Sequence, residues 1–351
     1  MAPERSWLEP PAAKTKRAAG RIVAKGTAKN VEAIANLGDR IAIAHHEGLS
    51  NSPGGITVLR RHDFTVVTAV THAFGPLDTT GATWLASGPL WRGRHASLRL
   101  LDPAALATVD TLPLCRPFVR VDEQMIVAHT PPMLYAKPGY DVDPAELRAA
   151  AIELPPQGGL VVVDLDRRTL RLLVAASQYD EFRAAELSPD RAIVYAASSF
   201  GRVVAVRIAD GELLWQRAAV ANVVIFALHA LALSPDGTRL ALAGSGNPHD
   251  LLVLDAATGR ELQQRRICPL LDRARVTPRP NARIEALGFH PAGWLAAATS
   301  AGAIAELHTD GRLSAFKASG AGIEAFAFVD DGRSLLVGGR EPQLRLWPVD
   351  L

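Results

Sequence analysis

The chain has 351 residues, which is enough for one large domain or two small ones. Its formal net charge is +2, and no apolar run reaches the ~18 residues of a membrane span, so neither bulk attraction to nucleic acid nor a transmembrane segment is indicated. Residues 1–20 carry charges and prolines where a signal peptide needs an apolar core, so we expect a disordered tail. The two cysteines, Cys115 and Cys268, suit a reducing compartment, and the expected location is the cytoplasm.

After this tail, short alternating apolar segments separated by turn residues predict β-strands up to the end of the chain. The clearest unit runs from Leu228 to Leu262 and reads as four strands. Its first turn, Ser234-Pro235-Asp236-Gly237, combines a proline that sets φ, an aspartate that bonds the backbone and a glycine that takes positive φ. Four antiparallel strands with open edges are not a stable domain by themselves, so further copies are expected.

Related turns recur along the chain at spacings close to those of a repeat protein. Seven units can be placed, with first strands that begin at about Val31, Leu77, Phe118, Arg183, Leu228, Arg283 and Ile323. The run SPDGTRLALAGS, followed by LLVLDAATGREL, resembles WD40-type and related bacterial propeller repeats, most clearly over residues 180–351. The Gly-His pair of WD40 repeats is missing, and their Trp-Asp pair is reduced to Leu254-Asp255. Residues 210–216 resemble quinoprotein-type propeller repeats instead.

This resemblance implies an all-β fold, a seven-bladed β-propeller of residues 21–351 with four antiparallel strands per blade. The last blade is one strand short, because the chain stops at Leu351. We expect Arg21–Gly26 to pair with Gln343–Trp347 and close the ring, since an open ring leaves unpaired backbone groups at both ends. The alternative is that Arg21–Gly26 belongs to the tail.

The two faces of such a propeller are expected to differ in loop length. Turns from first to second and from third to fourth strands are short, whereas the opposite, top face carries long connections. These are His46–Gly54, Gly88–Ala96, Thr130–Gly158, Gly244–Asp250, Thr71–Asp78 and Ile267–Ala282. Long loops on one face of a rigid scaffold indicate a binding surface, although tolerated insertion gives the same pattern.

The insertion in blade 3, at about residues 131–158, contains the one predicted helix. A capping Asp, then Pro, and Glu three residues after the cap begin at Asp143 and predict a helix over about residues 144–153. So short a helix must pack on its own blade, cover the channel mouth or dock a partner. Amphipathic residues of the kind enriched in interfaces precede it, namely Tyr135, Lys137 and Tyr140.

The innermost strands of blades 1, 6 and 7, which are neighbours in a closed ring, share one sequence template. It puts Glu32, Glu285 and Glu324 at equivalent heights near the channel mouth. Arg183 and His229 hold the same position in blades 4 and 5, so an acidic arc would face a basic one. WD40 proteins that this chain resembles often grip a peptide there, and an inserted Arg or Lys would suit three carboxylates. The alternative is local neutralisation of the carboxylates, for example by Arg21, Arg283 or Arg340.

Two other groups of basic residues stand out. Trp91, Arg92 and Arg94 in the blade 2 loop form a candidate contact hot spot. The Ile267–Ala282 link and its flanks carry clustered arginines, which can bind phosphate or nucleic acid. No aromatic residues are interleaved with them, so a solvated loop or an acidic protein contact is the favoured interpretation.

We find none of the specific enzymatic motifs searched for, such as a phosphate-binding Gly loop, His-Glu-x-x-His, Cys-x-x-Cys or Gly-x-Ser-x-Gly. Five histidines fall on the top face and make a metal site conceivable, but no spacing forces them together. They are His45, His46, His95, His129 and His249. We therefore expect no catalytic residues, no metal and no cofactor.

The sequence thus predicts a non-enzymatic scaffold that binds a peptide or a partner subunit of a bacterial-type complex on its top face. Neither a membrane nor a nucleic acid is an expected partner. The alternative is a propeller enzyme, a lactonase-like hydrolase or a quinoprotein relative, with a metal or cofactor at the channel mouth.

Overall fold

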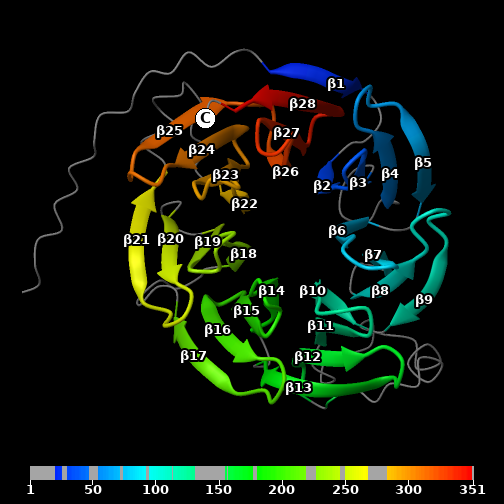
Figure 1. Ribbon diagram of the computed structural model, residues 1–351, viewed down its shortest axis with the longest axis vertical. Coiled ribbons are helices and arrows are strands. Elements are labelled where there is room, and N and C mark those ends of the chain that lie inside the picture. The colour runs from blue at the N-terminus through cyan, green and yellow to red at the C-terminus, as the bar shows by residue number, and fades with distance from the viewer. Residues whose placement is uncertain are drawn as a thin grey trace, which may run out of the picture.

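The computed structural model describes residues 20–25, 30–46, 54–71, 74–91, 95–112, 114–130, 155, 157–176, 180–218, 227–245, 250–267 and 283–349. Within these ranges the chain forms seven four-stranded antiparallel sheets, which surround one axis as the blades of a β-propeller (Figure 1). The predicted fold is therefore confirmed. The helix predicted over residues 144–153 lies outside the described residues. No helix in the described part of the chain has the length and apolar character needed to span a bilayer.

The first three blades follow the chain order from the axis outward. Blade 1 comprises β2 (Val31–Asn36), β3 (Arg40–His46), β4 (Gly54–Arg60) and β5 (Val66–Thr71). Blade 2 comprises β6 (Phe74–Asp78), β7 (Trp84–Trp91), β8 (His95–Leu101) and β9 (Thr108–Leu112). Blade 3 comprises β10 (Cys115–Arg120), β11 (Met125–Thr130), β12 (Gly159–Asp164) and β13 (Thr169–Ala175).

The other four blades repeat this order. Blade 4 comprises β14 (Phe182–Leu187), β15 (Ile193–Ser198), β16 (Arg202–Arg207) and β17 (Leu213–Ala218). Blade 5 comprises β18 (Ala227–Leu233), β19 (Arg239–Ser245), β20 (Asp250–Asp255) and β21 (Glu261–Arg266). Blade 6 comprises β22 (Ile284–Phe289), β23 (Leu295–Thr299), β24 (Ala303–Leu307) and β25 (Leu313–Lys317). Blade 7 comprises β26 (Ile323–Val329), β27 (Ser334–Gly339), β28 (Gln343–Pro348) and, from the other end of the chain, β1 (Arg21–Lys25).

The hydrophobic core lies between neighbouring blades. The second and third strands of a blade are mostly apolar, such as Leu295–Thr299 and Ala303–Leu307, in which every residue is buried. Side chains that alternate along such a strand point to opposite sides of the sheet, so each blade packs on both neighbours. Outer strands alternate between exposed and half-buried residues, as Val66–Thr71 does.

The ring is closed by β1, which pairs antiparallel with β28 in a register that sets Arg21 opposite Leu346 and Lys25 opposite Gln343. The predicted closure is confirmed, and Figure 1 shows β1 as the outermost strand of blade 7. Ala24 is buried with Ile41 and Ile43 of blade 1 and Leu344 of blade 7. The closing strand therefore contributes to the core as well as to the sheet.

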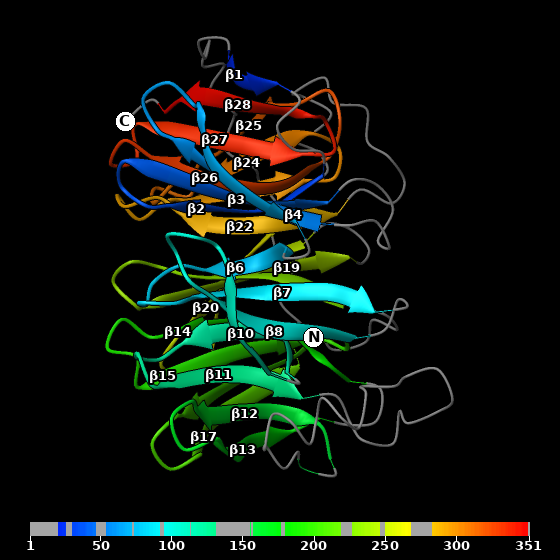
Figure 2. The same cartoon turned by 90° about the vertical axis from the view of Figure 1, so that its right-hand side faces the viewer.

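The two faces can be followed in Figure 2, where second strands such as β7 run to the right, toward the long-loop face. The first-to-second and third-to-fourth turns lie on the opposite side, the short-turn face. Residues 47–53, 131–158, 246–249 and 268–282 connect described strands on the long-loop face, and all of them except 155, 157 and 158 lie outside the described residues. The difference in connection length is therefore confirmed for blades 1, 3 and 5 and for the link from blade 5 to blade 6.

Blade 2 corrects two predicted loops. Its first strand was expected at Leu77, but β6 begins at Phe74, so Thr71–Asp78 is not a long link. Likewise β7 continues to Trp91 and β8 begins at His95, so the Gly88–Ala96 loop is much shorter than predicted. Both errors come from Gly-Pro pairs inside strands. Gly and Pro are tolerated there because register shifts occur at these sites, between Phe74 and Leu77 and between Ser87 and Leu90.

Candidate partner-binding rim

A register shift interrupts all seven innermost strands near the long-loop face. In β2, β14, β18, β22 and β26 one residue is inserted against the neighbouring strand. These single residues are Glu32, Arg183, His229, Glu285 and Glu324. In β6 and β10 two residues are inserted, Gly75-Pro76 and Arg116-Pro117. A β-bulge leaves its extra residue out of the ladder and re-aims its side chain. We call these seven positions the axial rim.

The axial rim brings the five sequence-predicted residues to equivalent register positions around the axis. Equivalent position follows from the shared template, because each carboxylate-bearing residue follows an Ile or Val and precedes an Ala. The predicted equal height of Glu32, Glu285 and Glu324 therefore agrees with the structure. The kind of ligand that can bind at these carboxylates depends on the charges around them.

Arginines pair with the carboxylates of Glu285 and Glu324. Arg283 Nε donates to Glu285 Oε1 at 2.7 Å, and Arg340 Nε donates to Glu324 Oε1 at 3.0 Å. A second nitrogen of Arg340 lies 4.0 Å from Glu285, so this guanidinium bridges blades 6 and 7. Both carboxylates are mostly buried, with 12% and 21% of the side chain exposed, whereas the arginines are 41% and 44% exposed.

Arg283 and Arg340 thus neutralise Glu285 and Glu324 locally, as the alternative interpretation of the arc predicted for these two arginines. One oxygen of Glu32, Oε2, is shielded from solvent. Arg21, the third candidate for neutralising the arc, lies in β1 opposite Leu346 and borders a pocket on the short-turn face. Its guanidinium belongs to a different site.

The side of the rim formed by blade 4 is less basic than predicted. The Arg183 guanidinium lies 2.8 Å from the carboxylate of Glu181, so the two charges compensate each other. Beside them, Arg202 pairs with Asp180 at 3.2 Å and lies over the Phe182 ring at 4.9 Å. His229 holds its rim position through the backbone of β18. An acidic arc is therefore present, but the described part of blade 4 offers a balanced ion-pair cluster.

Phe200, which the sequence analysis missed, adds an apolar element to this side. It lies in the short turn between β15 and β16 and is 57% exposed. Its N–H donates to Asp180 Oδ1 at 3.0 Å, and Gly201 N–H donates to Ser198 O at 3.1 Å, so the turn is held from both sides. Other exposed large hydrophobics of the described ranges lie on outermost strands, namely Ile22, Val66, Val67, Val109, Leu213 and Leu262. The sequence signal that could have identified Phe200 is a single aromatic residue in a short Ser-Ser-Phe-Gly turn.

Several predicted contact residues are not brought into this arrangement. Trp91 ends β7, where it pairs with His95 across the ladder, so it belongs to a strand and not to the predicted loop. Other predicted contact residues lie outside the described residues, namely Arg92, Arg94, Tyr135, Lys137 and Tyr140. Most of the arginine-rich Ile267–Ala282 link also lies outside them.

The histidines near the long-loop face are used within the fold where their side chains are described. His45 Nε2 is 3.0 Å from Thr57 Oγ1 in the same blade. His129 is buried and presents an edge to the Phe182 ring, with ring centroids 6.2 Å apart. Within the described ranges no group of three or more His, Cys, Asp or Glu side chains is placed to hold a metal ion.

Comparison with known proteins does not assign a family, because no protein-family model and no curated protein matches the chain. The seven sheets show the propeller arrangement by themselves. That architecture fits an interaction scaffold as well as an enzyme, so function has to be argued from the rim.

Proposed function

We propose that this protein is a non-enzymatic WD40-like scaffold that binds a peptide, or a segment of a partner protein, at the axial rim of the long-loop face. The observation that supports this most directly is the ring of register shifts. One β-bulge could be accidental, but bulges at seven equivalent positions present a set of re-aimed residues around one axis. Three of these residues are carboxylates on neighbouring blades.

The chemistry of the rim indicates the kind of partner. The acidic arc sets three carboxylates at equivalent positions of neighbouring blades, so it favours an inserted Lys or Arg side chain. Blade 4 lies across the axis from blades 7 and 1 (Figure 1) and offers the exposed Phe200 ring. A peptide that spans the rim would place a basic residue on the arc and an apolar residue on Phe200.

The predicted cytoplasmic location and membership in a bacterial-type complex are compatible with such a scaffold. Each remains a prediction, as does the absence of catalysis. A partner-binding role is supported by charge and exposure at one end of the axis, and it needs no metal or cofactor.

The experiment that tests this function uses a random peptide library displayed on phage and selected on the full-length protein. Enriched peptides should share a basic residue. Their affinity should fall roughly tenfold or more for the triple variant Glu32→Gln, Glu285→Gln, Glu324→Gln, because charged contacts to a partly buried site are lost.

A matched control carries the same three amide substitutions on the opposite face, Glu123→Gln, Glu212→Gln and Glu261→Gln. This control should bind as tightly as the unmodified protein. Equal affinity of the rim variant and the control variant, with both folded by thermal melting, would contradict the proposed function.

A further inference from the structure

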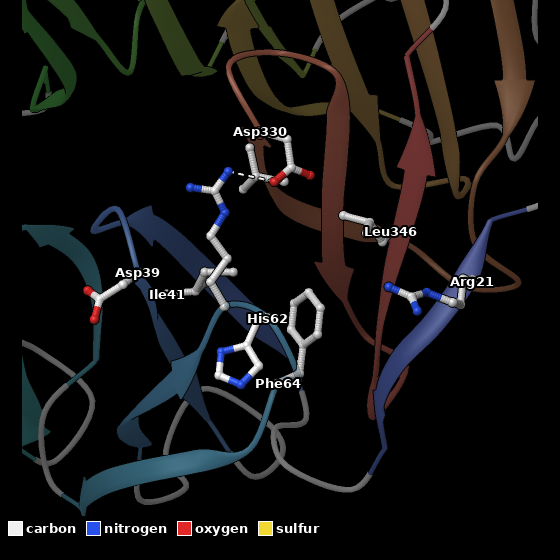
Figure 3. A pocket seen from close by; sticks show the side chains of 9 residues that line it. Arg21, Asp39, Ile41, His62, Phe64, Asp330 and Leu346 are labelled. Carbon is white, nitrogen blue, oxygen red and sulfur yellow. Dashed lines mark hydrogen bonds and ion pairs between the residues drawn. The ribbon is translucent and has the colours of Figure 1, made fainter.

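A pocket opens on the short-turn face at the seam where β1 closes the ring (Figure 3). It encloses about 370 Å³, within the range of small-molecule sites in proteins. Three parts of the chain form its wall. Arg21 comes from β1, His62 and Phe64 come from the turn after β4, and Val329 and Leu346 come from blade 7. A ligand here would contact both ends of the closed ring at once.

The floor of the pocket is apolar. Phe64 and Val329 are buried to 9% and 2% exposure, and Ile41 beneath them is fully buried. Phe64 has a backbone φ of 57°, although the equivalent turn position in blades 4, 5 and 6 is a glycine, for example Gly211 with φ of 79°. A bulky residue in this left-handed conformation costs about 1–2 kcal/mol.

In blades 1 to 3 the residue at this turn position is not glycine, and its side chain contacts the preceding blade. In blade 2 Leu106 is buried against the preceding blade, and in blade 3 Arg168 pairs with Asp110 of the preceding blade. In blade 1 the preceding neighbour is blade 7, so Phe64 projects into the seam. The strained turn thus supplies an aromatic surface to the pocket.

The charged side chains around the pocket differ in whether the protein itself supplies their partners. Arg61 donates to Asp330 at 2.6 Å and to Gly38 O at 2.8 Å, so its guanidinium is satisfied by the protein. Asp39 lies at the edge of the opening with its carboxylate directed away from Arg21 (Figure 3). Arg21 directs its guanidinium toward the Phe64 ring, and among the described residues no carboxylate lies within ion-pair distance of it.

We propose that this seam pocket binds a small organic monocarboxylate with an aromatic or branched aliphatic body. The carboxylate pairs with Arg21, while the body lies against Phe64, Val329 and Leu346. A guanidinium forks onto a carboxylate in a geometry that a halide or a neutral group cannot reproduce. This site is on the face opposite the axial rim and does not depend on the proposed scaffold function.

Binding here is linked to ring closure. Arg21 belongs to the closing strand, whereas Phe64 and Val329 belong to the two blades that the strand joins. The complete pocket exists only when β1 is paired with β28, so a ligand stabilises the closed ring by mass action. The melting temperature should therefore rise with ligand concentration.

The test uses 3-phenylpropionate as the probe and its neutral amide as the matched control, with the full-length protein, in thermal melting and calorimetric titration. We expect a saturable rise in melting temperature with the acid and none with the amide. An acetylated tripeptide that ends in a free phenylalanine carboxylate distinguishes a chain terminus from a free acid. Binding of the tripeptide with the affinity of the acid would assign the site to chain termini.

Two variants locate the site. Arg21→Gln should weaken the acid roughly tenfold or more, whereas Arg312→Gln, on the short-turn face of blade 6, should not. Phe64→Gly removes the ring but keeps a residue that the equivalent turns of blades 4 to 6 use, so the fold should persist while binding is lost. The proposal is overturned if acid and amide act alike, if Arg21→Gln binds normally, or if the acid gives no saturable shift at millimolar concentration.

Discussion

Arg21 and Leu346 lie opposite each other in neighbouring antiparallel strands, although nearly the whole chain separates them. Blade 7 therefore holds strands from both ends of the sequence, and its closing strand exists only in the complete ring. Removing β1 would expose the edge of β28 and the apolar residues that Ala24 covers.

Deletion of residues 1–29 should thus lower the melting temperature strongly or cause aggregation, whereas deletion of residues 1–19, which keeps β1, should not. Differential scanning calorimetry and light scattering on both variants provide the measurement. Equal melting of the two deletions would show that β1 adds nothing to closure.

Turns and repeats made much of this fold predictable. Ser234-Pro235-Asp236-Gly237 and its relatives mark the turn from the first to the second strand of a blade, and a repeated unit must bury its faces on copies of itself. The missing strand of blade 7 then had a single candidate, Arg21–Gly26, and the structure places β1 there. The template around Glu32 was informative for the same reason, since equal sequences in equal units take equal positions.

Other features have no local signature. In blade 2, Gly75-Pro76 reads as a loop because proline cannot donate to a sheet, yet the pair occupies a bulge in β6. Arg340 contacts carboxylates in two blades, which depends on the curvature of the ring and not on spacing along the chain. The seam pocket likewise depends on which side of β1 faces blade 1.

Gly332 and Gly311 form a matched pair of turn glycines. Both have positive φ, 88° and 81°, but a Cβ on Gly332 would overlap the His290 ring, whereas a Cβ on Gly311 would have no neighbour within 4 Å. His290 cannot easily move, because its ring stacks on Trp294 with centroids 4.7 Å apart and its Nε2 lies 3.0 Å from Gly332 O.

Gly311→Ala should therefore cost about 1 kcal/mol of unfolding free energy from backbone strain alone. Gly332→Ala should cost about 2–4 kcal/mol, since steric overlap adds to the strain. Urea denaturation at equal pH measures the difference. Equal losses of unfolding free energy for the two variants would mean that overlap with the His290 ring does not destabilise Gly332→Ala.

Phe200 and Val109 are both 57% exposed, but only Phe200 lies on the long-loop face. Phe200→Ser should leave the unfolding free energy within about 0.5 kcal/mol of the unmodified protein, as expected for an exposed residue. It should nevertheless weaken the peptides selected on the axial rim roughly tenfold or more, because interface aromatics dominate binding energy.

Val109→Ser, on the outer strand β9, is the control and should change neither quantity. If Phe200→Ser binds these peptides normally while the Glu→Gln rim variant does not, the partner contacts the acidic arc alone. Loss of stability in Phe200→Ser would instead assign the ring to the fold of its turn.

Glu186 gives a prediction for pH. It lies in the innermost strand β14 opposite Tyr195, and burial raises its pKa from the usual 4.5 to about 7, with the carboxylate of Asp78 acting in the same direction. The folded state therefore binds the proton more tightly than the unfolded state. The free energy of unfolding should decrease as pH rises from about 4.5 to about 7 and stay lowered above that range.

Glu186→Gln removes this penalty, so the variant should be more stable than the unmodified protein by roughly 1–3 kcal/mol at pH 8 and by much less at pH 5. Asp236→Asn removes a carboxyl whose pKa is shifted in the opposite direction, downward. Its Ser234 hydroxyl partner lowers the pKa of Asp236 to about 2, so stability is lost only as pH falls from the ordinary value of 3.8 toward 2. That variant should be less stable by the same amount at pH 5 and pH 8. A gain from Glu186→Gln that is equal at both pH values would show that improved packing, and not the proton, is responsible.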